Sequence, residues 1–168
     1  MSDTKLLKDS YSKARSGLLI MLFLTVANVL TVIFMKSETV FVFSAALPEI
    51  AMSFAMGNYY AQEGKLFIII LAATLLVALL AFYFLCWLFC KKKLAWMIAA
   101  TVMYAIDCAA NVGLLINAFV YVDDPSKEID LLPTVVTFLF AVWVMYYLVR
   151  GVRAGKELQR LKANVSDD

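Results

Sequence analysis

Four polar side chains could do chemistry within stretches of sequence that are otherwise apolar. Asp107 and Asn111 lie in the stretch YAIDCAANVG, which begins at Tyr104, and Asn28 lies in an earlier apolar run. A helix turns by about 100° per residue, so Tyr104, Asp107 and Asn111 would share an arc of about 60°. The amide of Asn28 can donate to a carboxylate on another helix. We therefore predict a polar site inside a membrane, formed by Asp107, Asn111, Asn28 and Tyr104.

The chemistry of that site depends on the state of Asp107. An ionisable residue at the centre of a membrane helix costs at least about 2.5–3.5 kcal/mol to insert, and such residues mark ion or proton pathways. No lysine or arginine lies within the apolar runs to pair with it, so we expect the acid to be partly or wholly protonated at neutral pH. Two roles stay open: a proton- or cation-coupled site, or an acid that hydrogen-bonds the first spanning helix to the third.

The elements that must position these side chains follow from the composition. The 168 residues are 64% hydrophobic and 17% charged, and the mean hydropathy is +0.84. Soluble domains have roughly 45–50% apolar and about 25% charged residues, so this chain has too little polar surface for a water-exposed globule. We predict an all-α integral membrane protein of about one domain.

Four apolar runs each approach or exceed the roughly 20 residues that a helix needs to cross a bilayer. They are 17–35, 66–89, 94–121 and 131–149. Lipid offers no partners for exposed backbone groups, so helices are the expected form. The predicted fold is a four-helix bundle, with an amphipathic N-terminus (1–16), a four-span domain (17–149) and a basic tail (150–168).

The distribution of basic residues decides whether the apolar segment 39–57 is a fifth span. With four spans, twelve of the fifteen lysines and arginines lie on one side, whereas five spans give a split of six and nine. Basic residues concentrate on the cytoplasmic side of a membrane. We therefore predict four spans with both termini cytoplasmic.

A short extra helix is predicted within that segment. Pro48 suits the first turn of a helix and Gly57 suits its end. A helix over 48–56 would be about 13 Å long at 1.5 Å per residue, which is too short to cross a bilayer. We expect it on the outer side, either lying at the interface or re-entering the bundle.

A second pattern lies nearly opposite the polar arc of the third span. Ala105, Ala109 and Gly113 repeat at every fourth position, and small residues at this spacing let two helix backbones approach closely. We predict a helix-packing face here. The third span would then lie at the centre of its own bundle, or between that bundle and a second copy.

Several function classes are disfavoured by the residues that the sequence lacks or scatters. Histidine is absent, and the three cysteines, Cys86, Cys90 and Cys108, form neither a CxxC pair nor a metal-ligand spacing. The sequence contains no nucleophile motif and no paired carboxylates at one membrane depth. We expect no metal, no cofactor and no enzymatic activity, and the basic tail is explained by topology without a nucleic-acid partner.

The stretches SKARSGLLIMLFLTVANV, FVFSAALPE, YAIDC and RAGKEL together resemble a group of small multi-pass membrane proteins of bacteria that have no assigned activity. The resemblance implies a bacterial cytoplasmic membrane. Our leading hypothesis is a transporter or channel for a small solute or ion that acts as a homo-oligomer in the lipid bilayer. The alternative is an accessory or scaffold subunit that binds another membrane protein through the third span.

Overall fold

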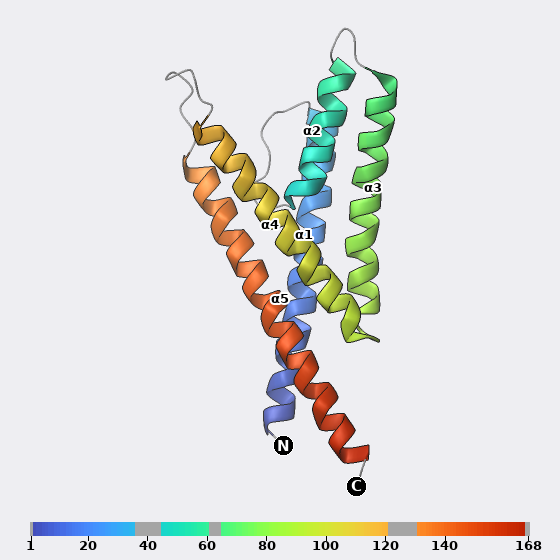
Figure 1. The fold of residues 1–168 in the computed structure, drawn as a ribbon, viewed down its shortest axis with the longest axis vertical. Helices are drawn as coiled ribbons and strands as arrows, with labels where there is room; N and C mark the ends of the chain where they lie inside the picture. Colours follow the sequence, from blue (N-terminus) through green and yellow to red (C-terminus); the bar gives the residue numbers. More distant parts are fainter. Residues whose placement is uncertain (1, 36–44, 61–64, 121–130, 167–168) are drawn as a thin grey trace.

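The computed structural model describes residues 2–35, 45–60, 65–120 and 131–166 (Figure 1). The elements in chain order are α1 (Ser2–Met35), α2 (Ala46–Tyr60), α3 (Leu66–Phe89), α4 (Leu94–Val120) and α5 (Leu131–Ser166). No strand occurs in the described part of the chain, which confirms the all-α prediction. The connections at 36–44, 61–64 and 121–130 lie outside the described residues, and so does the first part of the apolar segment 39–57.

Four helices are long and apolar enough to cross a membrane, as the sequence predicts. The qualifying stretches lie in α1, α3, α4 and α5, and they are Thr4–Thr31, Leu66–Phe89, Leu94–Gly113 and Val136–Asn164. α1 and α5 are continuous over 34 and 36 residues. The predicted N-terminal segment and basic tail therefore continue the neighbouring apolar helices within the described residues. Both termini lie at one end of the molecule (Figure 1).

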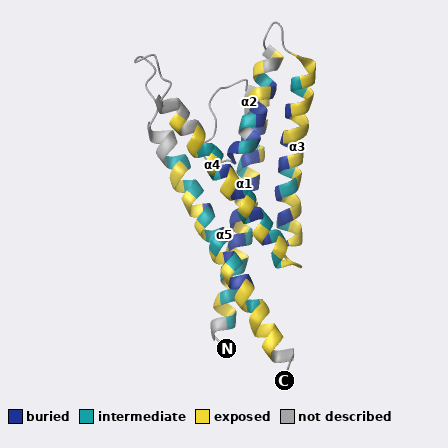
Figure 2. Cartoon of the chain, in the orientation of Figure 1, coloured by how far each residue is buried: buried dark blue, intermediate teal, exposed yellow. Residues whose placement is uncertain are grey.

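Large apolar side chains cover the outward faces of these helices. Phe23 is 70% exposed, Phe67 73% and Leu139 61%, and Figure 2 shows exposed residues along the outer sides and buried ones along the inner sides. So many exposed apolar side chains suit a lipid environment better than water. This surface agrees with a multi-pass membrane protein.

α1 and α5 make the most extensive helix contact, and they cross near the end that carries the termini (Figure 1). The approach is close because Gly151 has no side chain. A Cβ atom at Gly151 would lie 2.3 Å from the Cβ of Ala14, and one at Gly155 would lie 2.4 Å from Leu94 and 3.0 Å from Tyr11. Small residues at this crossing let the two backbones come together.

The main apolar core lies around this crossing. It is built from buried side chains of α1, α3, α4 and α5, among them Leu18, Tyr83, Met97 and Leu148. The hydroxyl of Tyr11 donates to the carbonyl oxygen of Cys90 at 2.5 Å. This hydrogen bond ties α1 to the connection between α3 and α4.

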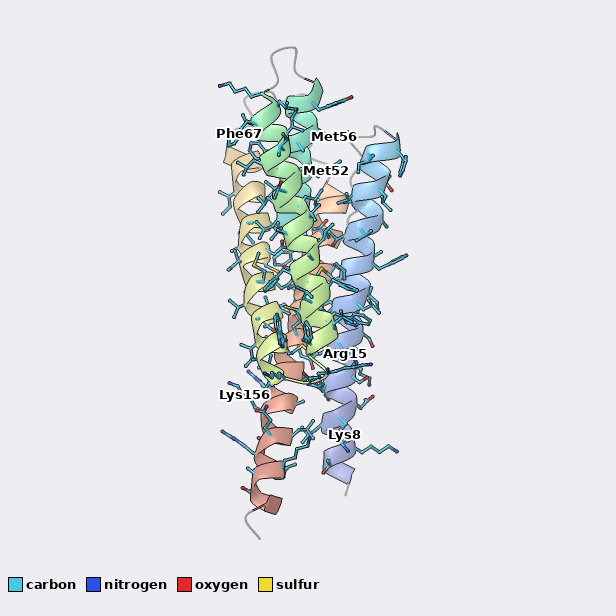
Figure 3. All side chains as sticks on the ribbon, turned by 90° about the vertical axis from the view of Figure 1, so that its right-hand side faces the viewer. Lys8, Arg15, Met52, Met56, Phe67 and Lys156 are labelled. Atoms are coloured by element: carbon cyan, nitrogen blue, oxygen red, sulfur yellow. The ribbon has the colours of Figure 1, made fainter. Side chains whose placement is uncertain are left out.

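α2 is a short helix that packs along α3 and also contacts α4 and α1. Its 15 residues correspond to about 22 Å, less than the roughly 30 Å of a bilayer core. A second apolar cluster of Val29, Ala51, Met52 and Leu76 holds it in place. Met52 and Met56 lie toward the end of the molecule opposite Lys8 and Lys156 (Figure 3).

The bounds of α2 differ from the predicted helix over 48–56. α2 starts two residues earlier and ends at Tyr60, so Gly57 lies inside the helix. The earlier start has a physical cause: side chains from α1 and α4 bind the backbone amides that precede Pro48. Those side chains form the candidate site described next.

Candidate functional site

Asp107 holds the N-terminus of α2. Its Oδ2 accepts a hydrogen bond from the backbone amide of Ala46 at 2.8 Å, and its Oδ1 accepts one from the amide of Leu47 at 2.7 Å. The side chain is 1% exposed and projects from the middle of α4. One carboxyl group thus joins α4 to the start of α2, and Leu47 and Asp107 are sixty positions apart in the sequence.

α1 completes the same site through Thr25. The hydroxyl oxygen of Thr25 accepts a hydrogen bond from the amide of Ala45 at 3.0 Å and donates to the carbonyl oxygen of Met21 at 2.8 Å. Thr25 is also 1% exposed. The start of α2 is therefore bound by one side chain from α1 and one from α4.

These contacts satisfy the backbone donors at the start of α2 one by one. The first amides of a helix have no partner within the helix, and a buried donor without a partner costs about 1–3 kcal/mol. The amides of Ala45, Ala46 and Leu47 are bonded to Thr25 and Asp107, and Pro48 has no amide hydrogen to satisfy. The sequence AALP can thus begin a helix inside the protein, away from water.

The structure brings three of the four predicted polar residues into the buried interior. Asp107, Asn28 and Tyr104 are at most 2% exposed, whereas Asn111 is half-buried. The backbone amides of Ala46 and Leu47 donate to Asp107, and a hydrogen bond from Asn28 to this acid stays a prediction. Thr25, one turn before Asn28, connects α1 to the site.

The expectation that Asp107 is protonated rested on the lack of a basic partner in the apolar runs. The structure supplies another form of compensation, because a helix N-terminus carries a partial positive charge and free amide donors. Each oxygen of the carboxyl group accepts one amide hydrogen. The protonation state of Asp107 stays a prediction. The lack of a nearby lysine or arginine is not enough to infer it, because the amides of α2 also stabilise the ionised form.

Two tyrosines lie beside the acid. Tyr83 of α3 and Tyr104 of α4 are 0% and 2% exposed, and both are within electrostatic range of Asp107. The Tyr83 hydroxyl is buried and has no hydrogen-bond partner within the described chain. A buried hydroxyl of this kind is uncommon in proteins. From the sequence, Tyr83 is one of few polar residues in its run and a weaker candidate than Asn28 for a partner of Asp107.

The predicted helix-packing face of α4 is exposed in the part of the chain that the structure describes. Ala105, Ala109 and Gly113 are all exposed, and a Cβ atom at Gly113 would meet nothing within 4 Å. The neighbouring residues Ile106 and Val112 are exposed on the same side. Within the described chain the close helix approach occurs at Gly151 and Ala14 instead.

The described residues contain no group of three or more His, Cys, Asp or Glu side chains that could hold a metal ion. Cys86 and Cys90 are buried free thiols and Cys108 is half-buried. The thiol of Cys90 donates to the carbonyl oxygen of Trp87 at 3.0 Å. These cysteines act as small side chains in helix packing.

Comparison with protein-family models, curated proteins and solved structures finds no match for this chain. The resemblance to small bacterial multi-pass proteins therefore stays a resemblance.

Proposed function

We propose that the chain is a four-span protein of a bacterial cytoplasmic membrane, with both termini cytoplasmic, that moves a small solute or ion. In this proposal α2 re-enters the four-helix bundle from the outer side and starts near mid-membrane. The observation that carries it is the buried Asp107 at the N-terminus of α2. Transport proteins build central sites from discontinuous helices whose N-termini lie at this depth.

The choice of an acid at this position supports a functional role. Asn and Ser cap helices about as well as Asp does, and neither carries the insertion cost of an ionisable group. A titratable cap can also be weakened by protonation, which gives α2 two states. We propose that gain or loss of a proton at Asp107 changes how firmly α2 is held, and that transport depends on this change.

Flux measurements on proteoliposomes test this proposal without a known substrate. The full-length chain is reconstituted with a trapped pH-sensitive dye, and the decay of an imposed pH gradient is followed with sodium or potassium as counter-ion. We expect faster decay than in empty liposomes, and loss of that difference in Asp107→Asn. The substituted side chain keeps its shape and one acceptor but cannot titrate.

The matched control is Thr74→Val. Thr74 lies on the exposed side of α3, and its hydroxyl donates to the carbonyl oxygen of Ile70 in the same helix. This variant should conduct as the wild type does. A wild-type decay no faster than that of empty liposomes, with each cation and at each pH tested, would overturn the transport proposal for protons and these cations. So would full activity of Asp107→Asn.

A second function is favoured by the exposed packing face of α4. Ala105, Ala109 and Gly113 lie open on an apolar surface, where a second transmembrane helix could approach closely. The chain would then be a homo-oligomer, or an accessory or scaffold subunit for another membrane protein. Native mass spectrometry of Ala109→Leu, with the exposed Ala73→Leu on α3 as control, should show loss of a partner in the first variant only.

A further inference from the structure

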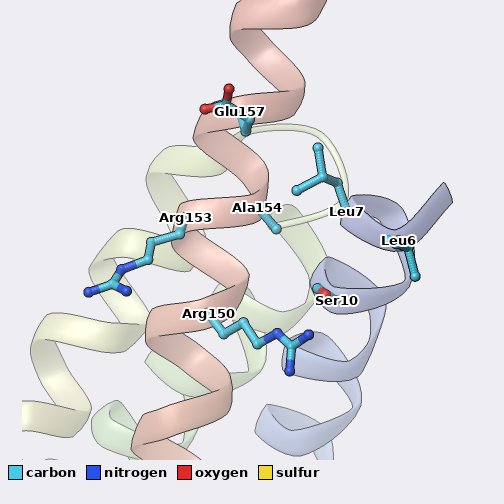
Figure 4. A pocket seen from close by; sticks show the side chains of 7 residues that line it. All are labelled: Leu6, Leu7, Ser10, Arg150, Arg153, Ala154 and Glu157. Carbon is cyan, nitrogen blue, oxygen red and sulfur yellow. The ribbon is translucent and has the colours of Figure 1, made fainter. Parts of the chain in front are cut away.

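A groove of about 360 Å³ lies between the beginning of α1 and the end of α5 (Figure 4). Sites for small ligands span roughly 300–1,000 Å³, so its size suits part of an amphiphilic molecule. Seven residues line it: Leu6, Leu7, Ser10, Arg150, Arg153, Ala154 and Glu157. The proposed transport function uses none of them.

The groove carries a net positive charge. Arg150 extends from α5 toward α1, whereas Arg153 leaves α5 on the other side (Figure 4). Arg150 donates to the hydroxyl of Tyr146 at 3.3 Å, which leaves most of its five N–H donors for another acceptor. The negative charge of Glu157 is partly balanced by Arg160, whose Nη1 lies 3.5 Å from Glu157 Oε2.

The rest of the lining is apolar or neutral. Leu6, which is 64% exposed, and Leu7 form one wall, and Ala154, which is 4% exposed, lies on the α5 side. Ser10 adds one hydroxyl. The lining thus offers a guanidinium group, a hydroxyl and a short apolar wall to a headgroup that carries a phosphate.

The groove lies next to the membrane interface, where phospholipid headgroups are found. The apolar run of α5 ends at Val149, and Arg150 begins a stretch with five basic residues. A boundary of this kind in a spanning helix falls at the membrane interface, where anionic headgroups attract basic residues. The guanidinium of arginine matches phosphate oxygens through paired hydrogen bonds.

We propose that the groove between α1 and α5 binds the phosphate headgroup of an anionic phospholipid. Arg150, the lining residue next to the apolar run of α5, binds the phosphate, and Arg153 adds positive charge. The polar end of the headgroup extends toward Ser10 and Leu7, and the acyl chains leave the groove toward the bilayer. A bound lipid would join the two helices beyond their crossing at Ala14 and Gly151.

Native mass spectrometry of the full-length chain in a neutral detergent tests this site. The probes are dioleoylphosphatidylglycerol and dioleoylphosphatidylcholine, titrated separately. We expect the wild type to bind the anionic lipid at least about tenfold more tightly. The double variant Arg150→Gln/Arg153→Gln should lose about 30-fold in affinity, since each basic residue near an anionic surface contributes about 1 kcal/mol.

The matched control is Lys156→Gln/Lys162→Gln, which removes the same charge from exposed positions of α5 outside the groove. It should change the affinity by less than about threefold. Arg150→Lys keeps the charge and loses the planar guanidinium, so an intermediate loss is expected. Equal losses in the two double variants would show diffuse attraction to the basic tail and would overturn the proposal.

Two further measurements distinguish a lipid site from a site for free phosphate and from a folding defect. Millimolar inorganic phosphate should leave the lipid bound, and displacement by phosphate would assign the groove to a free anion instead. If the double arginine variant does not fold, Ser10→Phe fills the groove and keeps every charge. Undiminished lipid binding by folded Ser10→Phe would also contradict the proposal.

Discussion

The crossing of α1 and α5 and the start of α2 hold helices together by opposite means. At the crossing, Gly151 has no side chain, and its backbone lies against Ala14. At the start of α2, two polar side chains, Asp107 and Thr25, bind three backbone amides. The contact between Gly151 and Ala14 requires a residue without a Cβ atom at position 151, and a larger side chain there would clash. The contacts at the start of α2 require the oxygen atoms of Asp107 and Thr25, and removing either side chain would leave backbone amides without acceptors.

This difference bears on what each region can do. A close apolar contact has one arrangement, so the crossing suits a fixed frame for the bundle. A polar contact made by a titratable acid can exist in two states, because its hydrogen bonds change when the acid gains a proton. We therefore place the proposed switching element at α2.

The largest loss of stability is expected for Asp107→Ala. The change leaves the amides of Ala46 and Leu47 buried without acceptors, at about 1–3 kcal/mol each, so we expect a loss of about 3 kcal/mol. Unfolding in detergent, followed by dye labelling of the buried thiols of Cys86 and Cys90, measures it. A loss below about 1 kcal/mol would show that α2 does not depend on this acid.

At the helix crossing, Gly151→Ala should cost about 2 kcal/mol, because the new Cβ meets Ala14 and one backbone must move. Ala14→Gly in the same chain removes the opposing atom and should restore most of that loss. The same labelling assay on both variants tests this pair. Gly113→Ala is the control, and it should be neutral or slightly stabilising, since a Cβ there has open space.

Thr25→Val should cost about 1.5 kcal/mol. The change keeps the shape of the side chain but leaves the amide of Ala45 without its acceptor. Its effect should also fail to add to that of Asp107→Ala, because both act on the start of α2. Additive losses in the double variant would mean that the two side chains hold α2 independently.

The smallest effect is expected for Tyr11→Phe. It removes one partly buried hydrogen bond, from the Tyr11 hydroxyl to the carbonyl oxygen of Cys90, and should cost about 0.5 kcal/mol. Thermal unfolding midpoints of wild type and variant, measured side by side, are sensitive enough. A loss as large as that of Gly151→Ala would show that the contact between α1 and the α3–α4 connection matters more than the glycine crossing.

The sequence predicts the helices better than it predicts their contacts. Run length and hydropathy are local properties, so the apolar helices follow from them directly. Pro48 likewise indicates the start of α2 to within two residues. The burial of Asp107 follows from its place in the middle of an apolar run.

The partners of Asp107 could not be predicted in the same way. Backbone amides occur at every residue except proline and carry no sequence signature, whereas a side-chain donor such as Asn28 can be recognised in the sequence. Only the path of the chain brings Ala46 to Asp107, across sixty-one positions. Long-range contacts of this kind depend on the packing of all the helices at once.

The sequence does contain a pattern that indicates the close contact at Gly151. The stretch GVRAG places glycines at 151 and 155, the same small-residue spacing as Ala105, Ala109 and Gly113. It lies just beyond the predicted end of the fourth span, among basic residues. The structure uses this pair at the crossing of α1 and α5 and leaves the α4 face exposed.

Hydrogen–deuterium exchange of the full-length chain in detergent tests most directly whether Asp107 holds the start of α2. Peptides that cover residues 45–52 should exchange slowly in the wild type and much faster in Asp107→Ala. Peptides from the crossing of α1 and α5 should exchange alike in both proteins. Unchanged exchange at 45–52 in the variant, with the fold intact, would show that Asp107 does not hold the start of α2.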